Sequence, residues 1–215
     1  MDWPLLEVKV WGDYACFTRP EMKVERVSYP VMTPSAARGV LEAIFWKPEF
    51  RWRVAEIAVL RPVRYWSILR NEVNSRISDR SARGWAATGG GFFADADRSQ
   101  RHTLALRDVA YVIRAEPVLL PHAMDDIAKY RDQFNRRVRS GRCFATPYLG
   151  CREFSAFFGE PGAGDTPIPE TSELGRMLLD IDFVESGGME PRFFDARLDG
   201  GVLRVPDRFA AVGRG

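Results

Sequence analysis

The pattern of apolar and polar residues at the start of the chain predicts a strand followed by an amphipathic helix. Residues 6–10 alternate between the two kinds, which is typical of a half-buried strand, and we expect the sheet to resume beyond a bend near Gly12. Thr33 supplies a helix N-cap and Pro34 a first-turn proline. Apolar residues recur behind them at helical spacing, and Pro48 is expected to end this helix.

The middle of the chain predicts strands separated by an irregular segment. Residues 52–60 and 65–73 are rich in Val, Ile and Trp, and both are expected to be strands. Residues 74–102 contain three consecutive glycines and five arginines, so we expect a mobile basic loop there. Residues 108–115 return to a strand pattern.

A second helix and a small antiparallel sheet are expected in the rest of the chain. The helix runs from about residue 123 to Ser140, and Gly141 is its natural left-handed stop. Residues 155–175 are rich in proline and glycine and predict a loop. Residues 179–183 alternate between apolar and polar residues and predict a strand. Residues 194–198 and 203–205 are apolar at alternate positions and flank a turn at residues 199–201, which predicts a β-hairpin.

This order of elements predicts an α+β protein. Strand, helix, two strands, a further strand and a helix begin a ferredoxin-like fold of the RNA-recognition type. We therefore expect a ferredoxin-like domain in residues 1–145. The small antiparallel sheet in residues 146–215 is either a second domain or an extension of the first.

Several kinds of site are not supported by the motifs present. The glycines at 89–91 lack the Lys-Ser/Thr pair of a phosphate-binding loop and are interpreted as a flexible linker. Asp180 and Asp182 stand two residues apart on a strand, which places both on a solvated face. His102 and His122 lack ligand spacing, so we expect no metal and no cofactor.

The cysteine content and the hydropathy pattern indicate a cytoplasmic protein. Three cysteines without a CxxC pair argue against a disulfide framework and fit a reducing compartment. No stretch approaches the about 20 apolar residues that span a bilayer, and the N-terminus has no export signal. We therefore expect no membrane partner.

Charge is distributed unevenly along the chain. The formal net charge is only +2, but residues 129–142 carry a local excess of positive charge and residues 159–199 an excess of negative charge. Only four of the 31 basic residues are lysines. Arginine suits forked contacts to phosphate, although genomic base composition also explains such a bias. One face for a polyanion and another that repels it are expected. Three tryptophans either stack bases or pack in the core: Trp11, Trp46 and Trp85.

Longer strings in the sequence are similar to a known family. They are VWGDYACFTRPEMKVER (10–26), LEAIFWKP (41–48), RNEV (70–73), PYLGCREF (147–154) and LLDIDF (178–183). Over about residues 6–208 the chain resembles the CRISPR-associated repeat-processing subunit of type I-C systems, a branch of the fifth Cas protein family.

The resemblance implies a ferredoxin-like N-terminal domain in residues 1–145 that carries a small C-terminal β domain in residues 146–215. It also implies a function. Members bind the hairpin of the CRISPR repeat RNA and cleave at its base without a metal ion. The product, crRNA, stays with the protein inside an antiviral surveillance complex. The implied partners are therefore the repeat RNA, crRNA and the other subunits of the type I-C complex.

The resemblance also implies a cutting site. The family places a tyrosine or histidine just before Trp-Lys-Pro, and a lysine–histidine or lysine–tyrosine pair on the later helix. The matching residues here are Phe45 and the pair Lys129 and Tyr130. Residues expected to contact RNA are Arg19, Lys23, Arg26, Lys47, Arg131, Arg136, Arg137 and Arg139.

The substitution at Phe45 leaves two functions open. Metal-independent cleavage needs a group that takes the ribose 2′-hydroxyl proton, a group that protonates the leaving oxygen, and positive charge on the phosphate. Lys129 supplies charge and Tyr130 a hydroxyl, but Phe45 can only stack or pack. The first hypothesis is therefore an endoribonuclease, and the alternative is a non-cleaving subunit that holds the crRNA 5′ handle. A general nucleic-acid binder is a third.

Overall fold

The computed structural model describes residues 3–22, 24–183 and 188–207 as an α+β protein. Two of its helices, α1 and α3, pack against one large sheet, which is antiparallel except where β2 joins it. The elements in chain order are β1 (Leu6–Ala15), β2 (Arg26–Val27), α1 (Pro34–Ile44), β3 (Phe50–Val59), β4 (Tyr65–Val73), α2 (Asp79–Thr88), the 3-10 turn η1 (Ala94–Asp97), β5 (Arg98–Leu119), α3 (Ile127–Ser140), β6 (Phe157–Gly159), β7 (Ser172–Phe183), β8 (Met189–Asp199) and β9 (Val202–Arg204).

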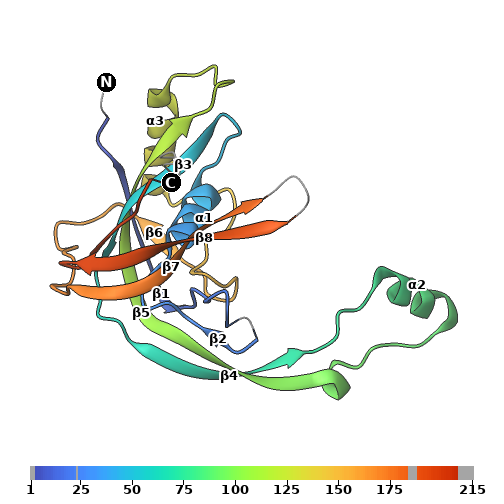
Figure 1. The fold of residues 1–215 in the computed structure, drawn as a ribbon. Coiled ribbons are helices and arrows are strands. Elements are labelled where there is room, and N and C mark those ends of the chain that lie inside the picture. The colour runs from blue at the N-terminus through green and yellow to red at the C-terminus, as the bar shows by residue number, and fades with distance from the viewer. Residues whose placement is uncertain (1–2, 23, 184–187, 208–215) are drawn as a thin grey trace, which may run out of the picture.

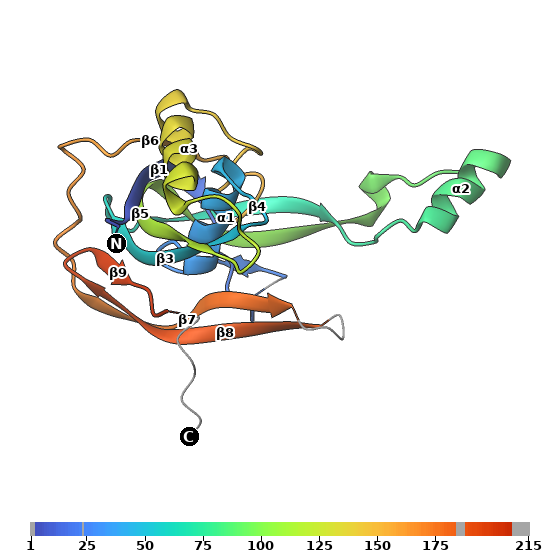
Figure 2. The ribbon, with the colours of Figure 1, turned by 90° about the horizontal axis from the view of Figure 1, so that it is seen from above.

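The sheet curls so that its last strands face its first ones. Its order is β6-β1-β5-β3-β9-β8-β7, with β2 and β4 also paired to β5. The β7–β8 hairpin passes over α1, and α3 lies beside β1 and β5 (Figures 1 and 2). Because β6 pairs with β1 and β9 with β3, strands from both sides of residue 145 share one sheet. The division into domains 1–145 and 146–215 stays a prediction.

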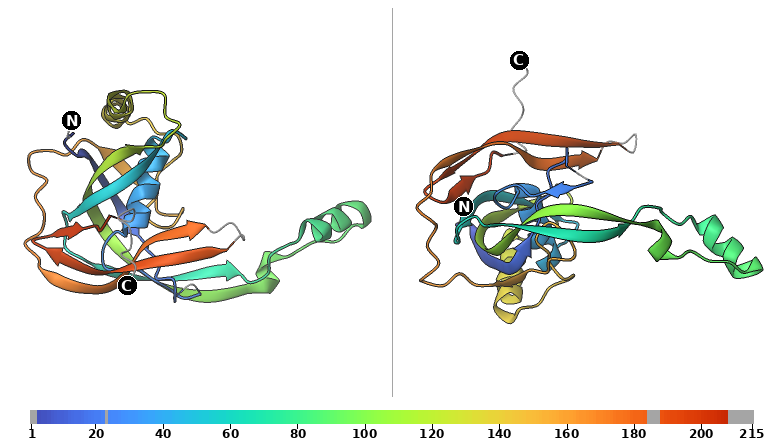
Figure 3. Two further views of the ribbon diagram at one scale, coloured as in Figure 1. Left: turned by 45° about the horizontal axis from the view of Figure 1, so that its top comes forward. Right: turned by 90° about the horizontal axis from the view of Figure 1, so that it is seen from below.

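The central strand β5 changes its partner at Asp108. Before this residue β5 pairs with β4, and after it with β3. Asp108 has φ 55, the left-handed conformation that aspartate tolerates better than most residues, and its carboxylate pairs with Arg61 and Arg64. The first half of β5 and β4 therefore leave the body as a two-stranded arm that carries α2 (Figure 3). No residue of β4 or α2 is buried.

The prediction of a loop at residues 74–102 is wrong in part. Residues 79–88 form α2, whose N-cap Ser78 accepts a hydrogen bond from the backbone N–H of Ser81 at 3.1 Å, and β5 already begins at Arg98. The arginines and glycines of this segment suggested irregular structure. An exposed helix needs little apolar periodicity, so the capping residue was the more informative signal.

The bend predicted near Gly12 does not interrupt the strand. β1 runs without a break from Leu6 to Ala15, and Gly12 pairs with Val109. A Cβ atom at Gly12 would lie 2.7 Å from the Cδ1 atom of Leu149 and 3.1 Å from the carbonyl oxygen of Ser155, so the glycine allows close packing here.

Both predicted helices of the body are confirmed. Thr33 caps α1, and the helix ends at Ile44, before Pro48. α3 begins later than expected because the Asp126 side chain accepts a hydrogen bond from the N–H of Ala128 at 2.7 Å and so fixes the first turn. Gly141 ends α3 with φ 63, as the sequence predicts.

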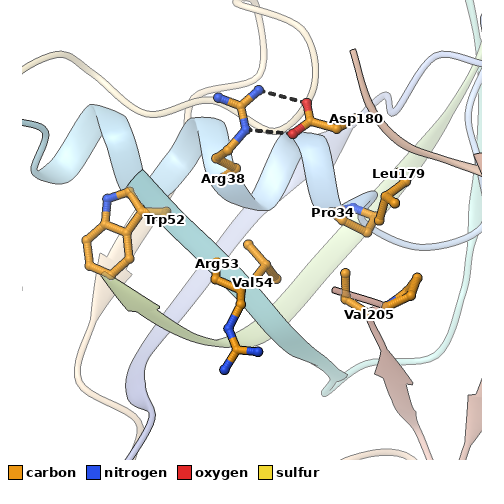
Figure 4. Close-up of a pocket in the computed structure, with 9 residues that line it drawn as sticks. Pro34, Arg38, Trp52, Arg53, Val54, Leu179, Asp180 and Val205 are labelled. Carbon is orange, nitrogen blue, oxygen red and sulfur yellow. Dashed lines mark hydrogen bonds and ion pairs between the residues drawn. The ribbon is translucent and has the colours of Figure 1, made fainter. Parts of the chain in front are cut away.

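Asp180 on β7 does not face solvent, contrary to the prediction. The pairing of β7 with β8 shifts register between Leu178 and Asp180, and this bulge breaks the alternation of the strand. The Asp180 side chain is turned towards α1, where Arg38 donates two hydrogen bonds to it at 2.8 and 3.1 Å (Figure 4). The pair ties the β7–β8 hairpin to α1. Asp182 pairs with Arg192 across the hairpin.

Within the described residues, no helix is both long enough and apolar enough to cross a membrane.

Candidate functional site

The residues of the implied cutting site meet where α1 ends, β3 begins and α3 begins. We call this region the junction and define it as residues 44–50 and 120–130. Phe50 pairs with Leu119 across β3 and β5, and the N–H of Leu120 donates to the carbonyl of Glu49 at 2.8 Å. These contacts fix the turn before α3 against the turn after α1.

Phe45 lies in an aromatic cluster beneath the junction surface. Its ring centroid is 5.5 Å from that of Phe50, which in turn is 5.2 Å from that of Tyr130. The indole N–H of Trp52 donates to the Phe45 carbonyl at 2.9 Å. Phe45 is 1% exposed, so its ring packs in the core and does not reach the surface.

Tyr130 belongs to the same enclosed cluster. It is 3% exposed, and its hydroxyl oxygen has no hydrogen-bond partner in the described part of the chain. Burial, together with the carboxylates of Glu49 and Asp125, raises the pKa of this hydroxyl. Tyr130 therefore keeps its proton at neutral pH and has no direct access to a ligand.

Lys129, the neighbouring residue, is exposed to solvent. Its ammonium donates to the Asp125 carboxylate at 2.7 Å, one helical turn earlier, and about half of the side chain is exposed. The hydrogen bond to Asp125 raises the pKa of Lys129. The side chain therefore stays positively charged at neutral pH, which suits contact with a phosphate and excludes a role as a proton acceptor.

Two of the arginines on α3 face the protein rather than solvent. Arg137 donates to the carbonyl of Ile44 at 2.7 Å, and its guanidinium lies 5.1 Å from the Phe45 ring centroid. It thereby caps the C-terminus of α1. Arg131 is 6% exposed, donates to the carbonyl of Pro4 and lies over the ring of Trp3. Their assignment as RNA contacts stays a prediction that this placement does not favour.

The remaining cations near the junction are accessible. Arg136 is exposed on the same side of α3 as Lys129, seven residues later, and Lys47 is exposed beside Trp46. Trp46 is 52% exposed, whereas Trp11 stacks on Phe157. Arg139 is exposed but pairs with Glu160 at 2.8 Å.

A second group of predicted RNA contacts lies at the base of the arm. Arg19 stacks over the Tyr29 ring at 4.5 Å. Arg26 on β2 donates to the Cys151 sulfur at 3.3 Å and lies within 4 Å of Glu72 and Glu153. Lys23 lies outside the described residues. Arg26 lies near the start of β5, since β2 pairs with Thr103 and Leu104, whereas α3 with Lys129 follows the end of β5 at Leu119.

The cysteine beside Arg26 is electrostatically perturbed. A hydrogen bond from Cys16 and the contact with Arg26 lower the pKa of the Cys151 thiol to about 6. The same hydrogen bond and burial raise the pKa of the Cys16 thiol. One of the two thiols therefore loses its proton more easily than the other, and the pair carries one negative charge before it carries two.

The sequence does not predict a role for His122, an exposed residue of the junction, beyond the metal ligation that its spacing argues against. His122 lies in the turn before α3, and its Nε2 atom is 2.9 Å from the carbonyl oxygen of Pro48. The signal that could have found it is its position seven residues before Lys129, at the start of the basic helix.

Much of the negative charge of residues 159–199 is paired with cations. Of its nine acidic residues in the described part of the chain, five form ion pairs: Glu160, Asp165, Glu173, Asp180 and Asp182. A repelling face in this segment stays a prediction. In the described ranges, no three side chains of His, Cys, Asp or Glu come together as a group suited to a metal ion.

Comparison with proteins of known sequence identifies the family. A family model for CRISPR-associated proteins, Cas_Cas5d, matches residues 5–206. The chain is 48% identical over 221 residues to the CRISPR pre-crRNA endoribonuclease Cas5d of Thermus thermophilus, covering 94% of this chain and 91% of the relative. It is 46% identical over 220 residues to the protein of the same name from Mannheimia succiniciproducens, covering 95% and 96%.

Solved structures share the fold at lower identity. A protein from Streptococcus mutans matches 94% of this chain with a TM-score of 0.66 at 19% identity, covering 92% of that structure. A CRISPR-associated protein matches with the same TM-score at 22% identity, covering 94% of this chain and 91% of that one. Since the family model spans almost the whole chain and both relatives match along nearly their full length, the protein belongs to the Cas5d family of CRISPR-associated proteins.

Proposed function

We propose that this protein is a metal-independent endoribonuclease that cuts CRISPR repeat transcripts and then remains bound to the product. The support is the near-full-length similarity to two proteins named CRISPR pre-crRNA endoribonuclease. The proposed setting is the cytoplasm, in a surveillance complex with the other type I-C subunits. A ferredoxin-like arrangement of residues 1–145 would provide the RNA-binding surface, and residues 146–215 the smaller β domain.

The observation that carries the proposal is the placement of Lys129 at the junction. Its ammonium is exposed, is held in place by Asp125, and stands on the same side of α3 as Arg136. A cation fixed in this way stabilises the extra negative charge that a phosphodiester gains as the ribose 2′-oxygen attacks. Lys47 and Trp46, on the facing turn, offer a phosphate contact and a stacking platform for an unpaired base.

The decisive experiment is incubation of the purified chain with its cognate repeat hairpin in EDTA, followed by analysis of the product ends. We expect a single cut that leaves a 2′,3′-cyclic phosphate on one fragment and a 5′-hydroxyl on the other. A parallel reaction in Mg²⁺ should give the same rate. Cutting that occurs only in Mg²⁺ would contradict the proposal.

A second function is favoured by one specific observation. The two side chains that the family would use beside Lys129 are both enclosed, and one of them, Phe45, has no group that can carry a proton. The alternative is a subunit that binds the crRNA 5′ handle without cutting. Binding of the cognate hairpin with no cleavage product, in either EDTA or Mg²⁺, would decide for it.

A general nucleic-acid binder is distinguished by competition. If contacts were made only to phosphates, random RNA and the cognate hairpin would compete equally and would lose affinity alike as salt rises. We expect the cognate hairpin to keep an advantage at high salt, since base contacts are screened less than phosphate contacts.

A further inference from the structure

The proposed reaction needs a proton acceptor, and the residues at the family positions do not supply one. Lys129 is held in its charged form by Asp125, and the Tyr130 hydroxyl is enclosed and keeps its proton. Phe45 has no polar atom. An acceptor for the 2′-hydroxyl proton must therefore come from another exposed group of the junction.

The carboxylates of the junction are poorly suited to this role. Asp125 already accepts a hydrogen bond from Lys129, and Asp126 accepts one from the N–H of Ala128 as the N-cap of α3. Glu49 has one oxygen, Oε2, that is enclosed without a partner. Each would also bring negative charge towards a phosphodiester, which opposes binding.

His122 is exposed and is the remaining candidate. The turn that carries it is fixed by the hydrogen bond from Leu120 to Glu49, and the imidazole itself is fixed by its contact with the Pro48 carbonyl. The other histidine, His102, lies opposite Leu69 on the arm, away from the junction. His122 therefore stands between Trp46-Lys47-Pro48 and the start of α3, where the cutting site is proposed.

The contact with Pro48 also fixes which nitrogen is available. A carbonyl oxygen can only accept, so the Nε2 atom at 2.9 Å must be the donor. In the neutral ring the other nitrogen, Nδ1, then carries the lone pair and can accept a proton. This is the same logic by which a hydrogen bond to one imidazole nitrogen selects the tautomer of a general base.

We propose that His122 is the general base of the cleavage reaction, a role that rests on the proposed endoribonuclease function. Nδ1 takes the proton of the ribose 2′-hydroxyl, and the 2′-oxygen forms a bond to the adjacent phosphorus. The bond from phosphorus to the 5′-oxygen breaks, and the Lys129 ammonium gives that oxygen a proton. The products are a 2′,3′-cyclic phosphate and a 5′-hydroxyl. Exchange with water returns His122 and Lys129 to their starting forms.

The test compares single-turnover cutting of the cognate repeat hairpin in EDTA by the wild type, His122→Ala, His122→Gln and His102→Ala. Loss of a general base is expected to slow both His122 variants by about 100-fold or more. The glutamine amide can still donate to Pro48, so equal losses in both variants would separate proton transfer from simple positioning. His102→Ala is the matched control and should cut at the wild-type rate.

Two further measurements make the result specific. The affinity of both His122 variants for a hairpin with a 2′-deoxy nucleotide at the cut should stay within about threefold of the wild-type affinity. The reason is that a general base acts on RNA that is already bound. Added imidazole should restore cutting by His122→Ala at least about tenfold, since free imidazole can replace a missing general base.

The outcomes are distinguishable from failure of the proposed function. If the wild type cuts and His122→Ala cuts equally fast, the role of His122 is overturned while the endoribonuclease stands. If His122→Gln keeps wild-type activity and imidazole has no effect on the alanine variant, the histidine only positions the turn, and the proposal is again overturned. A wild type that binds but never cuts would overturn both.

Discussion

The two faces of α3 carry the same residue types and have different surroundings. On one face Arg137 caps α1 and Arg131 binds the N-terminal segment. On the other, Lys129 and Arg136 reach solvent. The sequence shows only a run of basic residues, so the charge of a helix does not tell which cations are available to a ligand. Cations that satisfy a backbone carbonyl contribute to stability, and those left exposed can contribute to binding.

The largest expected effect on the exposed face comes from Lys129→Ala. We expect cutting of the cognate hairpin to fall by about 100- to 1,000-fold, because a fixed charge on the phosphate is lost in the transition state. Hairpin affinity should change by no more than about threefold, since one exposed cation contributes little to the binding of a long RNA.

Single-turnover cutting and a gel-shift titration check the two parts of this prediction. Asp126→Ala is not a suitable control because it removes the N-cap of α3. Arg204→Ala is suitable, because this residue lies on the distant strand β9 and is highly exposed. Equal cutting rates for Lys129→Ala and the wild type would show that the junction is not the active site.

Much of the fold could be predicted from the sequence because the local signals agreed with the final packing. Thr33, Pro34 and Gly141 placed the ends of the helices correctly. α2 was missed because it buries nothing. β5 was predicted too short because residues 98–102 pair with β4 alone and none of them is buried, so no core imposes an apolar face there. Local pattern is a weak guide wherever the chain leaves the body.

The site was less predictable because it depends on contacts between distant elements. The side chain of Tyr130 matches the family position, but its neighbour Phe50 is 80 residues away in the chain and encloses it. Arg137 could be recognised as a cap only once α1 was seen to end against α3. His122 becomes a candidate because of its contact with the Pro48 carbonyl, which no local sequence motif predicts.

The packed face is tested by Arg137→Ala, which should lower the free energy of unfolding by about 2 kcal/mol. The variant leaves the Ile44 carbonyl at the C-terminus of α1 without its donor. The matched control is Arg136→Ala, at the adjacent residue, whose side chain is exposed. It should change the free energy of unfolding by no more than about 0.5 kcal/mol. Urea unfolding measures both, and equal stabilities of the two variants would mean that the faces are not distinct.

A smaller effect is expected from charge reversal on the exposed face. Arg136→Glu should weaken hairpin binding about fivefold at low salt, because it removes a phosphate contact and adds repulsion. The slope of log affinity against log salt should become less steep by about one. Arg204→Glu on β9 is the control for a general charge effect. Unchanged affinity of Arg136→Glu at low salt would show that this side of α3 faces away from the RNA.

The smallest expected effect separates enclosure from chemistry at Tyr130. Tyr130→Phe removes a hydroxyl that is enclosed without a partner, so the free energy of unfolding should rise by up to about 1 kcal/mol. Cutting and hairpin affinity should both stay within about twofold of wild type, because the hydroxyl does not reach the surface that carries Lys129. Thermal unfolding and single-turnover cutting provide the two measurements. A tenfold loss of cutting with unchanged affinity would mean that RNA binding draws this hydroxyl out of the aromatic cluster, and the packed face of α3 would then contribute to the chemistry as well.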